Sequence, residues 1–161
     1  MKLSTEFEDL VLKQLESFGS SMGVIHLVVY LASPKNNSKT GFDLFQQWPQ
    51  VDKFLISIDD DPELRVASKN RRWYPIQDKN ILIGVLRVET DFINSDWPLA
   101  LDSRLKALSF SLSKTFAIEI ERQKKDEEVH YLRNQVGVII HQIRNPLAAL
   151  TTYAKLLLKR L

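Results

Sequence analysis

The spacing of apolar residues predicts a helix over residues 4–18, at the start of the chain. The apolar residues that would share one face are Phe7, Leu10, Val11, Leu15 and Phe18. Gly19 and the two serines that follow it supply a stop signal. We therefore expect one amphipathic helix that packs this face against the rest of a domain.

The chain then changes to short segments rich in β-branched residues, which predict strands. The first, GVIHLVVYLA at residues 23–32, is too short for a typical helix and ends at a cluster of turn residues. Further strand candidates are Lys53–Ile58, Leu64–Ser68, Arg71–Gln77 and Ile81–Glu89. Because short polar connections separate them, we expect an antiparallel sheet and an α+β fold.

From Asp96 onward the pattern is helical and continues to Leu161. Ser95 or Asp96 suits the N-cap, and Pro98 suits the first turn, where a missing N–H is tolerated. Beyond this turn the sequence has one proline, Pro146, and one glycine. A helix of this length is not stable alone, so it must pack along much of its length.

The helical region carries two apolar stripes, which a charged run separates. The first stripe is Leu101, Leu105, Leu108 and Leu112. The run Glu121–Glu128 is almost wholly polar and indicates a solvated helix supported by pairs such as Glu121 with Lys125. The second stripe alternates spacings of three and four residues and consists of Val129, Leu132, Val136, Ile139, Ile143, Pro146, Leu150, Tyr153 and Leu157. This alternation defines a heptad seam and predicts a parallel homodimer held by a coiled coil.

The two stripes differ in phase by three residues within the charged run. One interpretation is a discontinuity that overwinds a coiled coil locally and passes torque along it. The other is that the first stripe packs on the sheet and never shares the seam. The sequence leaves both interpretations open.

Composition narrows the classes of protein. The 161 residues are 44% hydrophobic, enough for a core, and their formal charge of only +2 argues against nucleic acid or a membrane surface as a partner. No cysteine is present, which excludes disulfides, a covalent bilin and a cysteine-ligated cluster. The longest apolar run, residues 23–32, is too short to span a membrane, and acidic residues interrupt the start of the chain. We expect a soluble cytoplasmic protein.

The stretch HQIRNPLAAL, which begins at His141, places a histidine and a proline inside the heptad pattern. Counting from the seam puts His141 on the outward face with Asn145 one turn later, while Gln142 and Arg144 flank the seam. Pro146 falls in the seam, where a proline costs about 3 kcal/mol and frees the carbonyl of Gln142. A kink beside an outward imidazole indicates a side chain that must be exposed and mobile.

This stretch resembles the H-box of sensor histidine kinases, which reads roughly H-[E/D]-x-[R/K]-[T/N]-P-L. The matching residues are His141, Arg144, Asn145, Pro146 and Leu147. The resemblance implies that His141 accepts a phosphoryl group that comes from ATP and passes it to an aspartate of a response regulator. It also implies that Asn145 orients the water that hydrolyses the regulator's phosphoaspartate. ATP and Mg²⁺ would bind in a catalytic domain for which this chain shows no motif.

Gln142 departs from the family pattern, which has a carboxylate at this position. An amide cannot take the proton of the attacking imidazole at neutral pH. Gln142 can orient the ring by a hydrogen bond while water or phosphate accepts the proton. We therefore expect slower or differently regulated phosphorylation of His141.

The first part of the chain resembles GAF domains, especially those fused to cyanobacterial-type sensor kinases. The resemblance rests on a leading helix, an antiparallel sheet with ILIGVLRVE near its end, DWP, and a helix ending AIEIERQ. It implies a GAF-like sensor domain at residues 1–120 and a signalling helix at 121–135. The first helix of a phosphotransfer domain, cut short, would occupy 136–161. The pattern typical of GAF domains that bind cyclic nucleotides is absent, so the ligand is unidentified.

Other chemistry-bearing residues are better interpreted as structural. His26 lies within a strand, where a hydrogen-bonded core histidine fits better than a haem ligand. Asp59–Asp61 precede a proline and suit a solvated turn better than a calcium site. Residues 71–74, RRWY, fit a strand edge with buried rings better than a nucleic-acid surface. We expect no metal site.

Together these patterns predict the input and phospho-acceptor part of a two-component sensor histidine kinase. Its parent protein would be an ATP-dependent histidine kinase, and this chain alone is not expected to be active. The alternative is a non-catalytic GAF-like module for ligand binding or dimerisation, with a vestigial H-box. The expected partners are a second copy in a parallel homodimer, a cognate response regulator and a small-molecule ligand of unidentified class.

Overall fold

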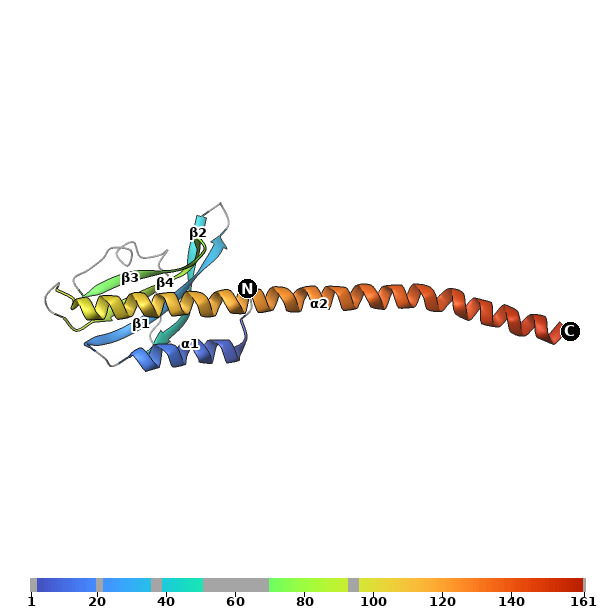
Figure 1. Cartoon of the computed structure of the whole chain (residues 1–161), viewed down its shortest axis with the longest axis horizontal. Coiled ribbons are helices and arrows are strands. Elements are labelled where there is room, and N and C mark those ends of the chain that lie inside the picture. The colour runs from blue at the N-terminus through green and yellow to red at the C-terminus, as the bar shows by residue number, and fades with distance from the viewer. Residues whose placement is uncertain (1–2, 20–21, 36–38, 51–69, 93–95, 161) are drawn as a thin grey trace. The chain divides into compact units, whose positions relative to one another are not determined.

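The structure is a computed structural model that describes residues 3–19, 22–35, 39–50, 70–92 and 96–160. Its elements, in chain order, are α1 (Thr5–Phe18), β1 (Val24–Lys35), β2 (Lys39–Trp48), β3 (Arg71–Asp78), β4 (Ile81–Thr90) and α2 (Leu99–Arg160) (Figure 1). The α+β class is as predicted. The chain divides into two units, Met1–Glu119 and Ile120–Leu161, and α2 contributes to both.

The first helix, α1, begins and ends as its sequence predicts. The hydroxyl of Ser4 accepts a hydrogen bond from the Phe7 backbone N–H at 3.3 Å, which caps the N-terminus. At the other end, the Gly19 N–H donates to the Leu15 carbonyl at 2.8 Å. The buried face is Phe7, Val11, Leu15 and Phe18. Leu10 was expected on this face but is 45% exposed.

The described strands form one antiparallel sheet in the order β2-β1-β4-β3. The structure confirms the strands predicted at residues 23–32, Arg71–Gln77 and Ile81–Glu89 with small shifts of their ends. The strand β2 was not predicted from the sequence. The strand candidates Lys53–Ile58 and Leu64–Ser68, and the turn Asp59–Asp61, lie outside the described residues.

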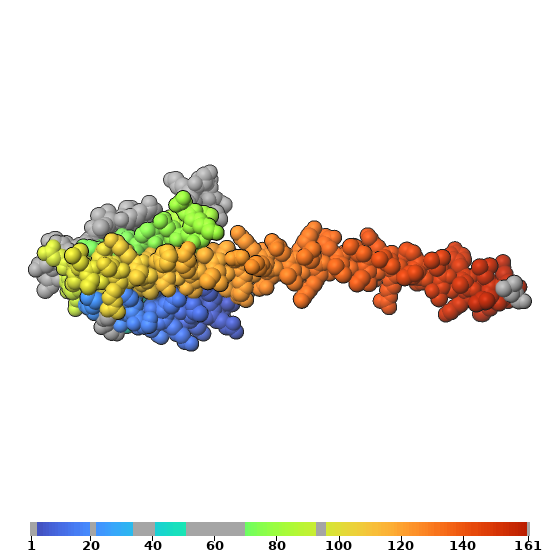
Figure 2. Space-filling view, in the orientation of Figure 1, coloured from blue at the N-terminus to red at the C-terminus, as the bar shows by residue number. Residues whose placement is uncertain are grey.

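The core lies on one face of the sheet, between the sheet and the two helices. Leu27 and Val29 of β1 and Leu86 and Val88 of β4 pack here against α1 and the first part of α2. Figure 2 shows these two helical segments side by side, and the Gln14 amide donates to the Thr115 hydroxyl between them at 3.1 Å.

The first apolar stripe of α2 belongs to this core. Leu101, Leu105, Leu108 and Leu112 are all buried among residues of the sheet and α1. The structure therefore supports the second of the two interpretations, in which this stripe packs within the domain and not in the heptad seam.

The start of α2 differs from the expected capping. The Pro98 carbonyl accepts hydrogen bonds from the N–H groups of Leu101 at 3.0 Å and Asp102 at 3.2 Å, and the helix begins at Leu99. Pro98 therefore occupies the N-cap position, because its carbonyl makes the first bond of the helix. The expected cap Asp96 precedes this point, and Ser95 lies outside the described residues.

Candidate functional site

The residues of the H-box-like stretch all lie in α2. Residues 141–150 are helical and exposed, so the chain itself leaves the His141 imidazole accessible. Gln142 and Asn145 are exposed in the same way. Because Asn145 follows His141 by four residues, the two side chains share one face of the helix. The helix thus places His141 and Asn145 together on one face and Gln142 beside that face.

Pro146 does not end the helix. The helical segment continues through Pro146 to Arg160. In the turn after the proline, the Thr151 hydroxyl donates to the Leu147 carbonyl at 2.9 Å and the Thr152 hydroxyl donates to the Ala148 carbonyl at 3.0 Å. Since a proline has no N–H to donate to the carbonyl four residues back, the backbone is weakened at Gln142, next to the imidazole.

The apolar surface around His141 is wider than the seam that a two-stranded coiled coil would bury. The seam residues Val136, Ile139 and Ile143 are 53%, 51% and 54% exposed. Further large apolar residues beside the seam are also exposed: Ile140, Leu147 and Leu156. Apolar residues at the seam and at the positions flanking it are typical of a helix that packs in a bundle of several helices.

The charged run between the two stripes is stabilised locally. The Lys125 ammonium lies 3.0 Å from the Glu121 carboxylate, as predicted, and the Arg122 guanidinium lies 3.7 Å from the Asp126 carboxylate. Both pairs join residues four positions apart, and such pairs each add a few tenths of a kcal/mol to a helix.

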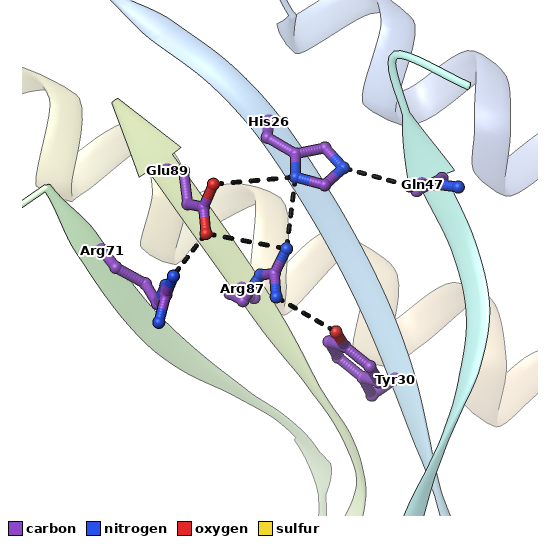
Figure 3. Close-up of polar contacts among 6 residues, drawn as sticks. All are labelled: His26, Tyr30, Gln47, Arg71, Arg87 and Glu89. Carbon is purple, nitrogen blue, oxygen red and sulfur yellow. Dashed lines mark hydrogen bonds and ion pairs between the residues drawn. The ribbon is translucent and has the colours of Figure 1, made fainter. Parts of the chain in front are cut away.

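A second group of polar and charged side chains lies on the sheet face opposite the helices (Figure 3). On β4, Arg87 and Glu89 alternate with the core residues Leu86 and Val88, so they point to the other side. Cross-strand pairing places His26 beside Glu89. The complete group, which we call the sheet-face cluster, is His26, Tyr30, Gln47, Arg71, Arg87 and Glu89.

Arg87 is the centre of this cluster. Its Nη1 donates to the Tyr30 hydroxyl at 3.3 Å, and its Nη2 lies 3.2 Å from His26 Nδ1. Its guanidinium also lies 3.6 Å from the Glu89 carboxylate, which accepts a hydrogen bond from Arg71 Nε at 2.9 Å. The Arg87 side chain is only 4% exposed, so one strongly buried cation organises the whole group.

Both ring nitrogens of His26 have partners. Nε2 lies 3.1 Å from the Gln47 side-chain oxygen, and Nδ1 faces the Arg87 guanidinium. Nδ1 also lies 3.8 Å from the Glu89 carboxylate, so side chains of β2 and β4 hold the ring on both sides. The prediction of a hydrogen-bonded histidine is confirmed, although the residue lies on the face away from the helical core.

The cluster keeps Glu89 ionised. Contact with His26, followed by the charges of Arg87 and Arg71, lowers the pKa of the Glu89 carboxyl from 4.5 to about 2, although burial opposes this.

The described part of the chain holds no group of three or more metal-ligating side chains, and none of its helices is long and apolar enough for a membrane span.

Only part of the cluster was predictable from the sequence. His26 and Arg71 stood out as separate residues, whereas Arg87 and Glu89 did not. The available signal was the pair of charges at alternating positions of the otherwise apolar segment ILIGVLRVE, because such residues share one face of a strand.

A groove of about 600 Å³ lies between β3, the last of the described strands on that side of the sheet, and α2. Here the Tyr74 hydroxyl donates to the Asp102 carboxylate at 2.8 Å, and Arg72 and Lys106 lie within ion-pair distance of Asp102. Burial and the bond to Asp102 raise the pKa of Tyr74. Since these polar groups satisfy one another, the groove ties α2 to the sheet. Residues 71–74 lie in a strand, as predicted, and the Tyr74 ring is buried.

The exposed histidine motif lies on a helix that follows an α+β domain, and this motif is the feature that resembles sensor histidine kinases. The chain is similar to the sensor histidine kinase Hik2 of Thermosynechococcus vestitus, with 26% identity over 179 residues. The match covers 98% of this chain and 46% of Hik2, so the chain spans about half the length of that relative. No protein-family model and no solved structure matches the chain.

Proposed function

We propose that this chain is the input and phospho-acceptor part of a two-component sensor histidine kinase, with His141 as the phosphorylated residue. The observation that carries the proposal is the H-box-like motif on an exposed face of α2. Similarity to Hik2 over nearly the whole chain also supports it.

In the proposed reaction, an imidazole nitrogen of His141 attacks the γ-phosphorus of ATP. An N–P bond forms, the P–O bond to ADP breaks, and the imidazole loses its proton. ATP and Mg²⁺ would be held by a separate nucleotide-binding domain. The phosphoryl group then passes to an aspartate of the response regulator. Both steps need an imidazole that two different partners can reach, and the exposed face of α2 provides one.

Gln142 determines how the proton leaves in this proposal. Its amide oxygen can accept a hydrogen bond from the N–H of one ring nitrogen, which would hold the other nitrogen, with its lone pair, towards the phosphorus. It has no basic group, so water or phosphate must take the proton. Asn145, one turn later, would orient the water that hydrolyses the regulator's phosphoaspartate. Pro146 weakens the backbone at Gln142 and would allow the imidazole to move between its two partners.

We further propose a GAF-like sensor domain at residues 1–120, with a signalling helix after it. The sheet with both helices on one face agrees with the element order of that fold. The exposed seam from Val129 to Leu157 would pair with the same seam of a second copy in a parallel homodimer. The apolar residues that flank the seam would contact a further helix of a bundle.

The alternative is a non-catalytic module for ligand binding or dimerisation in which the H-box is vestigial. Gln142 is the residue that favours it, because the position lacks the usual carboxylate. The two functions differ in one measurable outcome, which is whether His141 receives phosphate.

Phosphotransfer to the purified chain tests the proposal. The chain is mixed with a nucleotide-binding domain from a sensor histidine kinase and ATP labelled at the γ-phosphate. We expect acid-labile label on wild type and none on His141→Ala. His130→Ala is the matched control, because His130 is another exposed histidine of α2 and its loss should leave labelling unchanged.

Gln142→Glu adds a second measurement. Restoring a carboxylate supplies a base, so labelling should be faster by about tenfold to a hundredfold. Label on neither wild type nor Gln142→Glu, or equal label on wild type and His141→Ala, would refute the proposal. Label on Gln142→Glu alone would establish the vestigial alternative.

A further inference from the structure

Two oppositely charged residues flank the start of the exposed seam in the second unit. Glu128 lies one residue before the seam residue Val129, and Arg133 lies one residue after the seam residue Leu132. In the heptad these are the positions on either side of the seam, and both side chains are exposed. Charges at such flanking positions decide which helices pair and in which direction.

Glu128 and Arg133 cannot satisfy each other within one helix. Side chains meet on a helix surface when they are three or four residues apart, whereas these two are five apart. The charged run before them is different, because its ion pairs of 3.0 and 3.7 Å join residues four positions apart. Within the described part of the chain, neither Glu128 nor Arg133 has an ion pair. Both charges therefore remain available to another helix.

A spacing of five residues is the one that a second, parallel helix requires. In a parallel two-stranded coiled coil without an offset, the position before a seam residue on one helix contacts the position five residues later on the other. Glu128 of one chain would then face Arg133 of the second copy. Twofold symmetry repeats this contact on the other side of the seam, so the dimer would contain two such ion pairs.

Other arrangements of the same seam lose these attractions. A shift of one heptad between parallel helices would place Glu128 against Asp126, which also carries a negative charge. In an antiparallel pair, each flanking position contacts the same flanking position of the other helix. The next residues at the two positions are Gln135 and Ile140, and no later residue at either position along the seam is charged. The charges therefore favour a parallel dimer without an offset.

We propose that Glu128 and Arg133 form two symmetric ion pairs between two copies of the chain, and that these pairs make the dimer parallel and without an offset. The inference rests on the homodimer along the seam proposed above, and adds what determines its direction and register. Because the two chains are then aligned residue by residue, the two His141 imidazoles lie at the same level of the dimer. A partner would therefore meet equivalent surroundings at each imidazole.

Exchanging the charges between two variants tests these ion pairs. In Glu128→Lys two cations would face each other at each contact, and in Arg133→Glu two carboxylates would. We expect each variant alone to raise the dimer dissociation constant about tenfold. A mixed dimer, with one chain of each variant, again has a cation opposite a carboxylate at both contacts. It should therefore form in preference to either homodimer.

Native mass spectrometry of the mixture, with one variant labelled with ¹⁵N, measures the three kinds of dimer. Random pairing makes half of the dimers mixed, whereas we expect about nine tenths. The matched control is a mixture of Glu127→Lys with Lys124→Glu. These substitutions reverse charges in the same run, but at exposed positions that face away from the seam, so their pairing should remain random.

A cysteine in the seam tests direction and offset directly, because the chain contains none. In Val136→Cys, a parallel dimer without an offset places the two thiols opposite each other, within the distance that a disulfide needs. Mild oxidation should therefore link the two chains almost completely. Val138→Cys is the matched control, since Val136 and Val138 are 53% and 54% exposed but Val138 lies outside the seam. It should stay largely unlinked.

Three results would overturn the inference. Random pairing of the two charge variants would show that Glu128 and Arg133 do not meet. Equal linking of the two cysteine variants, or linking of neither, would exclude a parallel dimer without an offset. A monomeric wild type would overturn the proposed homodimer as well, whereas a dimer that pairs at random overturns this inference alone. Phosphate labelling of His141 is a separate measurement, so the proposed reaction and this inference fail independently.

Discussion

Single residues on the two faces of the sheet have different roles. Gly84 brings two strands together, Arg87 holds a charge below the surface, and Tyr74 connects β3 to α2 through Asp102. None of these roles is visible from the residue alone, because each depends on the residue that the fold places opposite. His141 is different, since its proposed role needs only a helix and an open surface.

Glu89 makes the stability of the sheet domain decrease at acidic pH. Its pKa is 4.5 in the ordinary environment and about 2 in the folded chain. Because the pKa is lower in the folded state, the ionised carboxylate stabilises the fold at pH values above its unfolded-state pKa. This contribution is lost as the pH falls from about 4.5 towards 2. We expect Glu89→Gln to lower the free energy of unfolding at pH 7 by about 2 kcal/mol and to flatten its decline below pH 5.

Urea unfolding followed by circular dichroism at pH 7, 5, 4 and 3 measures this dependence. Glu16→Gln removes an exposed carboxylate of α1 and should leave the acid profile of the wild type unchanged. If Glu89→Gln and wild type lost stability in parallel between pH 5 and pH 3, the carboxylate would not contribute as described.

At the scale of helices and strands, the elements with a regular apolar pattern were predictable from the sequence, and β2 was not. The strands β3 and β4, the helix α1 and the first part of α2 follow simple periodicities that their burial largely reproduces. In β2, the register against β1 shifts between Val29 and Tyr30, which leaves Phe45 between paired positions. Phe42 therefore packs on one face, and Phe45 and Trp48 pack on the other. A bulge of this kind removes the alternation that identifies a strand.

The candidate sites were predictable to different degrees for the same reason. The H-box lies within a single helix, so a local pattern was sufficient to place His141, Gln142 and Asn145 on its surface. The sheet-face cluster joins residues from four strands, and its existence depends on which residues face one another. His26 and Arg87 are 61 residues apart in the chain, and no local pattern predicts that pairing.

The pairing of β1 with β4 depends on a glycine. A Cβ added at Gly84 would lie 2.1 Å from the Tyr30 carbonyl oxygen and 3.2 Å from the Leu31 Cα, both backbone atoms. Since backbone in the middle of a sheet cannot move aside easily, we expect Gly84→Ala to destabilise the domain by about 2 to 3 kcal/mol. Urea unfolding monitored by tryptophan fluorescence measures the loss.

Gly137→Ala is the control for this substitution. A Cβ at Gly137 has nothing within 4 Å, and the residue lies in α2. Alanine should therefore stabilise the helix by about 0.5 to 1 kcal/mol. Equal stability of Gly84→Ala and wild type would show that the two strands are less closely paired than described.

At the scale of the whole molecule, the two units use α2 in different ways. In the first unit α2 buries its leucine stripe inside the domain, and that face is fully occupied within one chain. In the second unit the large apolar residues remain exposed, including the seam and residues beside it. A surface of this kind is costly in water, and a second copy of the chain would bury it.

Two neighbouring substitutions test whether a second copy covers the seam. Ile139 is in the seam and 51% exposed, whereas Val138 is outside it and 54% exposed, so a single chain would tolerate aspartate equally at either position. In a parallel dimer, Ile139→Asp buries two facing charges and loses two apolar contacts, each worth roughly 1.5 to 3 kcal/mol. We therefore expect Ile139→Asp to raise the dimer dissociation constant at least a hundredfold and Val138→Asp to change it less than threefold. Sedimentation velocity across micromolar concentrations distinguishes these outcomes. A monomeric wild type, or equal dissociation by both variants, would contradict pairing along the seam, while a dimer that only Ile139→Asp dissociates would place the same face of both helices together.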